Sequence, residues 1–130
     1  MKNYLYIGIG GAFGAVCRLL ITRLWPSTGT VFPFGTLACN LVGCVLLGYL
    51  TYALFPRMSE QVKLMITTGF IGAFTTLSTF SMETVILLEN GRTLLAFAYV
   101  VTSLIGGMGF VWLGSRLAGH DKHRGDRSNG

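Results

Sequence analysis

Four runs of this chain contain no charged residue, and short polar stretches separate them. Each run is about as long as a membrane-spanning helix, which needs roughly 20 residues. The runs cover residues 3–17, 24–56, 64–82 and 93–115. In the second run Pro26, Gly29 and Pro33 favour a loop, so the helix is expected to begin at Phe34. The pattern predicts an all-α membrane protein with four transmembrane helices, at about residues 3–22, 34–55, 61–88 and 93–117.

The third run carries a polar interruption. From Gly69 to Ser81 it reads GFIGAFTTLSTFS, which includes two glycines and five hydroxyl residues. Each unpaired backbone polar group in hydrocarbon costs several kcal/mol, so lipid would favour an unbroken helix at this depth. Irregular backbone survives there only when it is buried in protein or lines a path for water or ions. We therefore expect the third helix to be broken in the middle of the membrane, and we expect transport rather than simple anchoring.

The composition agrees with one small membrane domain. Of 130 residues, 52% are hydrophobic and 12% are charged. The domain is expected to cover residues 1–118. The segment 119–130 is polar and basic without an apolar period, so it predicts a disordered cytoplasmic tail. His120 and His123 could bind a metal, but no third ligand is near them in the sequence, and a solvated basic tail is the better interpretation.

The placement of basic residues predicts the orientation. Four spans put both termini on the same side as the loop at 57–63, and that side carries most of the lysines and arginines. The positive-inside rule places this side of the protein in the cytoplasm, with the helices in the bacterial plasma membrane. Without the tail the charge difference between the two sides is small, so the bundle itself specifies its orientation only weakly. The net charge of +5 reflects this topology and does not indicate a nucleic-acid partner.

Polar side chains inside the spans narrow the function. Thr36 and Asn40 are four residues apart, as are Tyr99 and Ser103, so each pair shares one helix face. Neutral hydroxyl and amide groups suit an ion that sheds its water and must leave again. Hydrogen bonds between helices explain the same residues equally well. Both interpretations remain open from the sequence.

Two of the charged residues in the predicted spans could act on a pore. Arg18 lies inside the first helix close to its end, and Glu83 lies near the end of the third helix. Either would set the electric field at the mouth of a pore, and snorkelling or capping explains them equally well. Glycines such as Gly10 and Gly14 allow helices to approach closely. Four helices enclose little polar space alone, so oligomerisation is expected.

Three motifs occur in order on the first three predicted helices: GGAFGAVCR at 10–18, GTLACN at 35–40 and GFIGAFTTLSTFS at 69–81. With the four spans, they resemble the fluoride channels of the Fluc, or CrcB, family. The resemblance covers nearly the whole chain. It implies an antiparallel, dual-topology dimer in membrane lipid, in which two pores lined by both subunits export fluoride passively and protect the cytoplasm from it.

The resemblance also implies a structural sodium ion at the centre of the dimer. By position, the backbone carbonyls of Gly72 and Thr75 would hold it. Carbonyls freed by a helix break suit a hard cation, which agrees with the expected interruption.

The pore residues that the resemblance implies are polar or aromatic. Asn40 and Phe80 would contact fluoride, since an amide donates hydrogen bonds and the edge of an aromatic ring is positive. Arg18 would lie near a vestibule. The polar neighbours of Asn40 and Phe80 along the path would be Thr36, Ser78, Thr79, Tyr99 and Ser103.

Two positions depart from the family pattern. Leu77 stands where the family usually has a second phenylalanine, and Gly107 stands where it has a serine. Leucine has no ring quadrupole, so one subunit cannot complete an aromatic pair. A homodimer is the first expectation, and a heterodimer with an oppositely oriented sister subunit is the alternative.

Rival functions lack their key residues. A small four-helix, proton-coupled multidrug exporter needs a carboxylate deep in its first helix, and this chain has none there. A non-transporting assembly protein would have no use for the hydroxyls of the third run. No enzyme is indicated, because the spans contain no paired carboxylates and no histidine beside a nucleophile.

Overall fold

The computed structural model describes residues 1–25 and 32–128, and every regular element in that part of the chain is helical. Four helical stretches are long and apolar enough to cross a membrane, as the sequence predicts. They are Lys2–Leu24, Phe34–Ala53, Glu60–Glu89 and Thr93–Arg127. The loop predicted at Pro26 and Gly29 lies outside the described residues. Pro33 is the N-cap of the second helix, which begins at Phe34 as expected.

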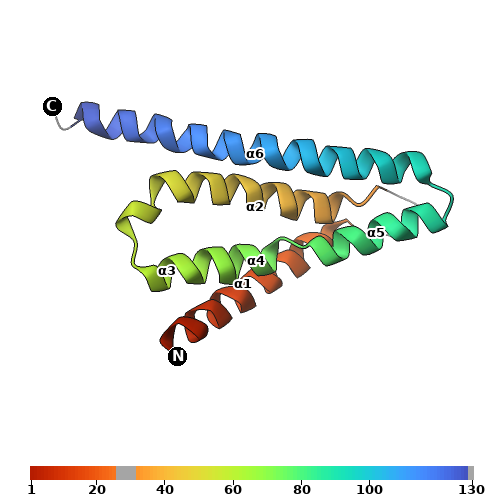
Figure 1. Ribbon diagram of the computed structural model, residues 1–130, viewed down its shortest axis with the longest axis horizontal. Helices are drawn as coiled ribbons and strands as arrows, with labels where there is room; N and C mark the ends of the chain where they lie inside the picture. Colours follow the sequence, from red (N-terminus) through yellow and green to blue (C-terminus); the bar gives the residue numbers. More distant parts are fainter. Residues whose placement is uncertain (26–31, 129–130) are drawn as a thin grey trace.

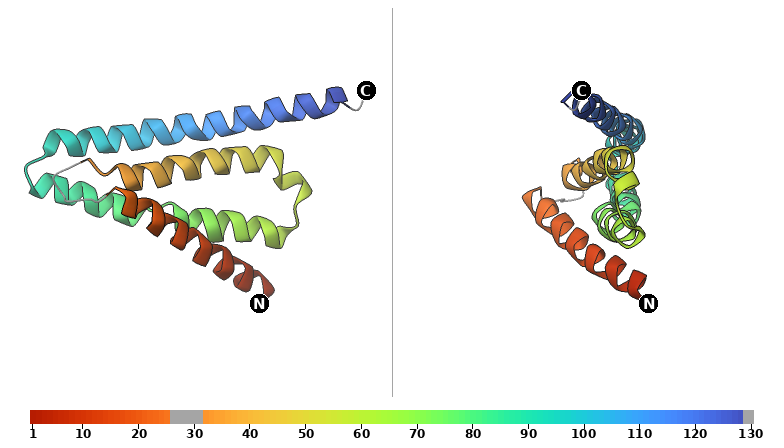
Figure 2. Two further views of the ribbon diagram at one scale, coloured as in Figure 1. Left: turned by 180° about the vertical axis from the view of Figure 1, so that it is seen from behind. Right: turned by 90° about the vertical axis from the view of Figure 1, so that its left-hand side faces the viewer.

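Helices α1 (Lys2–Leu24), α2 (Phe34–Ala53) and α6 (Thr93–Ser128) are continuous. Figure 1 shows α2 and α6 side by side, with the third span below them and α1 crossing that span at an angle. The view along the molecule in Figure 2 shows α1 diverging from the other helices. Both termini and the turn after α2 lie at one end of the bundle (Figure 1), which agrees with the predicted arrangement of the termini.

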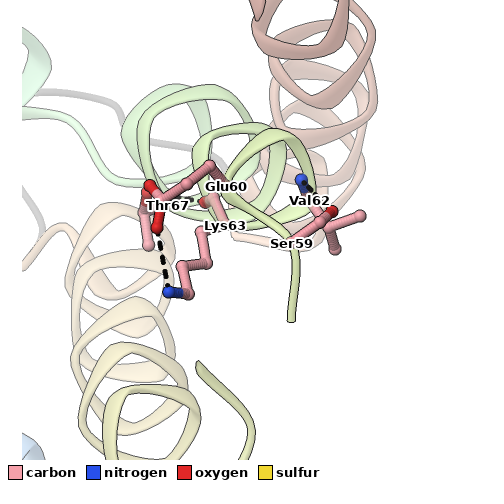
Figure 3. A network of polar contacts seen from close by, with 5 residues as sticks. All are labelled: Ser59, Glu60, Val62, Lys63 and Thr67. Carbon is pink, nitrogen blue, oxygen red and sulfur yellow. Dashed lines mark hydrogen bonds and ion pairs between the residues drawn. The ribbon is translucent and has the colours of Figure 1, made fainter. Parts of the chain in front are cut away.

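The third span is built from several short elements. Ser59 caps its start by accepting a hydrogen bond from the Val62 N–H, and Lys63 pairs with Glu60 at 3.1 Å (Figure 3). The connection from α2 is a single 3₁₀ turn at Phe55–Arg57, where Pro56 ends the preceding helix two residues earlier than predicted. The elements that follow are α3 (Glu60–Leu64), the π-helical η2 (Met65–Ile71), α4 (Gly72–Phe74) and α5 (Leu77–Glu89).

Glycines bring the helix backbones together. A Cβ atom at Gly14 would overlap the carbonyl of Phe70, where α1 crosses η2. A Cβ at Gly114 would overlap the carbonyl of Val45, where α6 packs on α2. Without side chains at these positions the backbones reach van der Waals contact, which is the usual packing of membrane helices. The predicted packing role of Gly14 is therefore confirmed.

The C-terminal segment differs from its prediction. We expected a disordered tail from residue 119, but α6 continues as a helix to Ser128. The segment contains no proline, and Tyr49 of α2 donates a hydrogen bond to Asp121 at 2.8 Å. This contact ties the first turn of the extension to the bundle, so the charged residues beyond it extend an existing helix. Composition alone does not carry that information.

Candidate functional site

The interruption of the third span is two residues long. The backbone leaves the helical conformation at Thr75 (ψ 153°) and at Thr76 (φ −149°, ψ 119°). Asn40 of α2 meets the interruption directly. The Thr76 N–H donates to Asn40 Oδ1 at 2.8 Å, and Asn40 Nδ2 donates to the Thr76 carbonyl at 3.3 Å. One amide therefore bonds both the N–H and the carbonyl of Thr76. The Nδ2 group has a second N–H, which these two hydrogen bonds do not use.

The interruption also deprives two backbone carbonyls of their helical donors. In a continuous helix the Thr76 N–H would bond the Gly72 carbonyl, but here it donates to Asn40. In the same way, the Thr79 N–H would bond the Thr75 carbonyl, but it donates to Thr76 Oγ1 at 3.2 Å. These are the two carbonyls that the family resemblance implies as sodium ligands, and the N–H groups that would bond them in a continuous helix donate to side chains instead. Hard cations prefer such oxygen ligands.

A groove runs along the interruption between α2, α5 and α6. It brings together Asn40, Phe80 and Ser103, three of the predicted pore residues. The hydroxyl of Ser103 is buried and has no hydrogen-bond partner among the described residues. Such a group costs free energy unless another partner satisfies it. The other residues that line the groove include Cys44, Thr75, Thr76, Leu77 and Gly107.

Phe80 connects the groove to a second polar cluster. Its ring centroid lies 4.9 Å from that of Tyr99, which is fully buried. The Tyr99 hydroxyl donates to Glu83 Oε2 at 2.9 Å, and Thr36 Oγ1 donates to Glu83 Oε1 at 2.8 Å. The carboxylate of Glu83 thus holds both hydroxyls. Thr36 and Tyr99, which were predicted to line the path, therefore bond to Glu83 and do not line the groove. Asn40 and Ser103, their neighbours on the same helix faces, do line it.

Three other predicted residues lie outside the groove. Ser78 and Thr79 gather around the hydroxyl of Thr76, at 3.3 Å and 3.2 Å respectively, at the start of α5. Arg18 is half-buried on α1 and does not line the groove. Leu77, in contrast, does line it, and 77% of its side chain is exposed. In this single chain the groove therefore has one open, apolar wall.

Sequence reasoning missed the role of Thr76, which caps α5 and pairs with Asn40. The signal was present, because threonine is a typical residue directly before the first turn of a helix. Its hydroxyl there accepts a hydrogen bond from the N–H three residues later. It also left the role of Glu83 open. Phe80 and Glu83 are three residues apart and so share one face of α5. Because the ring of Phe80 packs against Tyr99, this spacing was the available signal that Glu83 also faces Tyr99. No comparable signal marks Cys44, whose place in the groove depends on how α2 packs against α6.

Residues outside the helix break offer no obvious metal site. In the part of the chain that the structure describes, no group of three or more His, Cys, Asp or Glu side chains lies close enough to hold a metal ion. His120 and His123 are exposed on the extension of α6. A metal ligand set built from side chains is thus not found among the described residues, and the backbone carbonyls at the break are the remaining candidates.

Comparison with known proteins gives a family match and relatives that cover nearly the whole chain. Residues 5–115 match the family described as CrcB-like protein, Camphor Resistance (CrcB). A fluoride-specific ion channel, FluC 2, of Listeria innocua is 44% identical over 124 residues, covering 94% of this chain and 95% of that protein. The fluoride-specific ion channel FluC of Chlorobaculum tepidum is 42% identical over 120 residues, covering 91% and 95%. The channel of the same name from Methanocaldococcus jannaschii is 42% identical over 119 residues, covering 91% and 95%.

Proposed function

Because the chain belongs to the CrcB family of multi-pass membrane proteins, we propose that it is a fluoride-selective ion channel. It lets fluoride leave the cell passively and so protects the cytoplasm. The observation that carries this proposal is the groove in which an amide, an aromatic ring and an unpartnered hydroxyl meet beside a helix break. A coupled multidrug exporter is disfavoured, since the relatives are ion channels and α1 contains no carboxylate.

The groove residues suit the chemistry of fluoride. This ion is small and strongly hydrated, so a selective path has to replace its water with hydrogen-bond donors. Asn40 Nδ2 and Ser103 Oγ provide donors without a full charge, which would hold the ion too tightly for conduction. The positive ring edge of Phe80 adds a weak attraction for an anion. Selection and release are then both accounted for by neutral groups.

We propose that a second subunit covers the open groove. Its wall at Leu77 is exposed, and the other large apolar side chains on the surface include Phe13, Val16 and Leu104. We propose that an antiparallel copy covers the groove, which gives two pores per dimer. The two copies would bring the paired carbonyls of Gly72 and Thr75 together on the two-fold axis, where they would hold a structural sodium ion. Carbonyl oxygens whose helical N–H donors bond to side chains suit such an ion, and it would join the two breaks.

The residue at position 77 would differ in its effect between two forms of the proposed dimer. A homodimer lacks the second aromatic residue in both pores, whereas a sister subunit with phenylalanine at this position supplies one of them. We propose the homodimer first. Its pores then rely on Phe80 alone, and the rim at residue 77 is apolar without being aromatic.

Fluoride efflux from vesicles tests the proposal. The purified chain is reconstituted in liposomes loaded with potassium fluoride, and a fluoride electrode follows release after valinomycin is added. Release by the chain alone supports a working homodimer. Release only after a sister subunit is added supports a heterodimer, and sealed vesicles in both cases contradict the channel.

A further inference from the structure

The extension of α6 carries a basic face that the proposed channel does not use. Arg116 is exposed, and the residues that follow it at intervals of three and four lie on the same face of the helix. We call this face the basic stripe, and it consists of Arg116, His120, His123, Arg124 and Arg127. All five side chains are exposed, and none of the five is acidic.

The acidic residues of the extension lie on another face. Asp121 accepts the hydrogen bond from Tyr49, and Asp126 lines a cleft between the extension and the end of α2. Arg57 and Lys122 line the same cleft as these two carboxylates. The charges of the cleft therefore largely balance. The charge of the stripe does not, although His123 borders both surfaces.

The position of the stripe along α6 places its base at the membrane surface. A helix crosses about 30 Å of hydrocarbon in about 20 residues, so a span that begins at Thr93 ends near Trp112. Trp112 is exposed, and the guanidinium of Arg116 lies 4.7 Å from the centre of its ring. Tryptophan and arginine are both typical of the headgroup region. The stripe therefore begins among lipid headgroups and rises about 16 Å from Arg116 to Arg127.

We propose that the basic stripe binds anionic phospholipid headgroups around the end of α6. Basic segments next to a membrane span attract anionic lipid, by about fivefold in affinity for each arginine near the surface. The attraction falls off over roughly 8 Å at physiological ionic strength, so Arg116 and Arg124 contribute more than Arg127. A nucleic acid or an acidic protein would have to approach the bilayer to reach the same face, whereas lipid already surrounds its base. This inference does not depend on fluoride conduction.

Tryptophan quenching tests the proposal in the full-length chain. The chain has two tryptophans, so Trp25→Phe leaves Trp112 as the only reporter. The protein is reconstituted in equimolar phosphatidylglycerol and phosphatidylcholine, with bromine on one lipid or the other. Quenching should be stronger with brominated phosphatidylglycerol, corresponding to about a fivefold preference that weakens in 1 M salt.

A matched pair of variants separates the stripe from net charge. Arg116→Gln with Arg124→Gln removes two positive charges from the stripe, and Arg57→Gln with Lys122→Gln removes two from the cleft. The preference should fall at least severalfold in the stripe variant and persist in the cleft variant. All four side chains are exposed, so both variants should fold, which circular dichroism checks. Equal quenching by the two brominated lipids in the parent, or an equal loss in both variants, would overturn the proposal.

Discussion

Replacing Asn40 with aspartate separates the two roles of this side chain. Aspartate has nearly the same shape and keeps the oxygen that accepts the Thr76 N–H at 2.8 Å. It loses the Nδ2 group that donates to the Thr76 carbonyl at 3.3 Å, together with the N–H available to an anion. The helix break should therefore survive, while a donor in the groove becomes a negative charge. Fluoride conduction should fail for electrostatic reasons.

The size of the effect follows from the distances at the site. A fluoride ion that bonded Asn40 in the parent would pass about 4 Å from the new carboxylate. Two like charges at this separation repel by about 4 kcal/mol at the effective dielectric constant of a partly buried site. A barrier higher by that amount slows passage about a thousandfold. The loss of one neutral hydrogen bond, about 1 kcal/mol, is the smaller effect.

Fluoride efflux from liposomes measures this change directly. The matched control is Asn3→Asp, which makes the same chemical substitution at an exposed position at the start of α1. Control vesicles should empty at the parent rate, while Asn40→Asp vesicles should retain fluoride, with both proteins eluting as the same oligomer. Parent-like efflux through Asn40→Asp would remove Asn40 from the path of the ion.

Further changes test the surroundings of the groove. Thr76→Val removes the cap of α5 and should lower the free energy of unfolding by about 1 kcal/mol, measured by denaturation in detergent. Gly43→Ala places a methyl group against the side chain of Thr75 and should cost about 1–3 kcal/mol, whereas Gly107→Ala meets only a sulfur at 3.6 Å and should cost far less. Equal stability of the two alanine variants would contradict the packing. Glu83→Gln replaces one acceptor oxygen by an NH₂ group, so one of its two hydroxyl partners can no longer donate to it and both lose a charged acceptor. Thermal unfolding should then occur at a lower temperature, corresponding to about 1–3 kcal/mol. Replacing sodium with a large organic cation should weaken the dimer in cross-linking assays, and an unchanged dimer would argue against the carbonyl site.

The helices could be predicted from the sequence because their signals are local. Charge-free runs locate the four spans, and the helices beginning at Phe34 and Thr93 start where they were expected. The helix is interrupted at Thr75 and Thr76, within the segment where glycines and hydroxyl residues are concentrated. The π-helical turns of η2 carry no such mark. They arise where the third span packs against α1, which is a tertiary effect.

Three of the residues selected from the sequence line the candidate groove, but the hydrogen bonds around it could not be predicted. Asn40, Phe80 and Ser103 could be selected by residue type and resemblance, and they line one groove. The reciprocal bonds between Asn40 and Thr76 join residues 36 positions apart, so no local pattern contains them. The same holds for Glu83, which engages hydroxyls from two other helices. Distant partners of this kind emerge only when the helices pack.

A reversal potential tests the passive and selective passage of fluoride most directly. The purified chain is placed in a planar bilayer with a tenfold gradient of fluoride and equal chloride on both sides. The current should reverse near the fluoride equilibrium potential, about 59 mV in magnitude, and a proton gradient should not shift it. Reversal near zero, or a reversal potential that follows the proton gradient, would contradict a fluoride-selective channel.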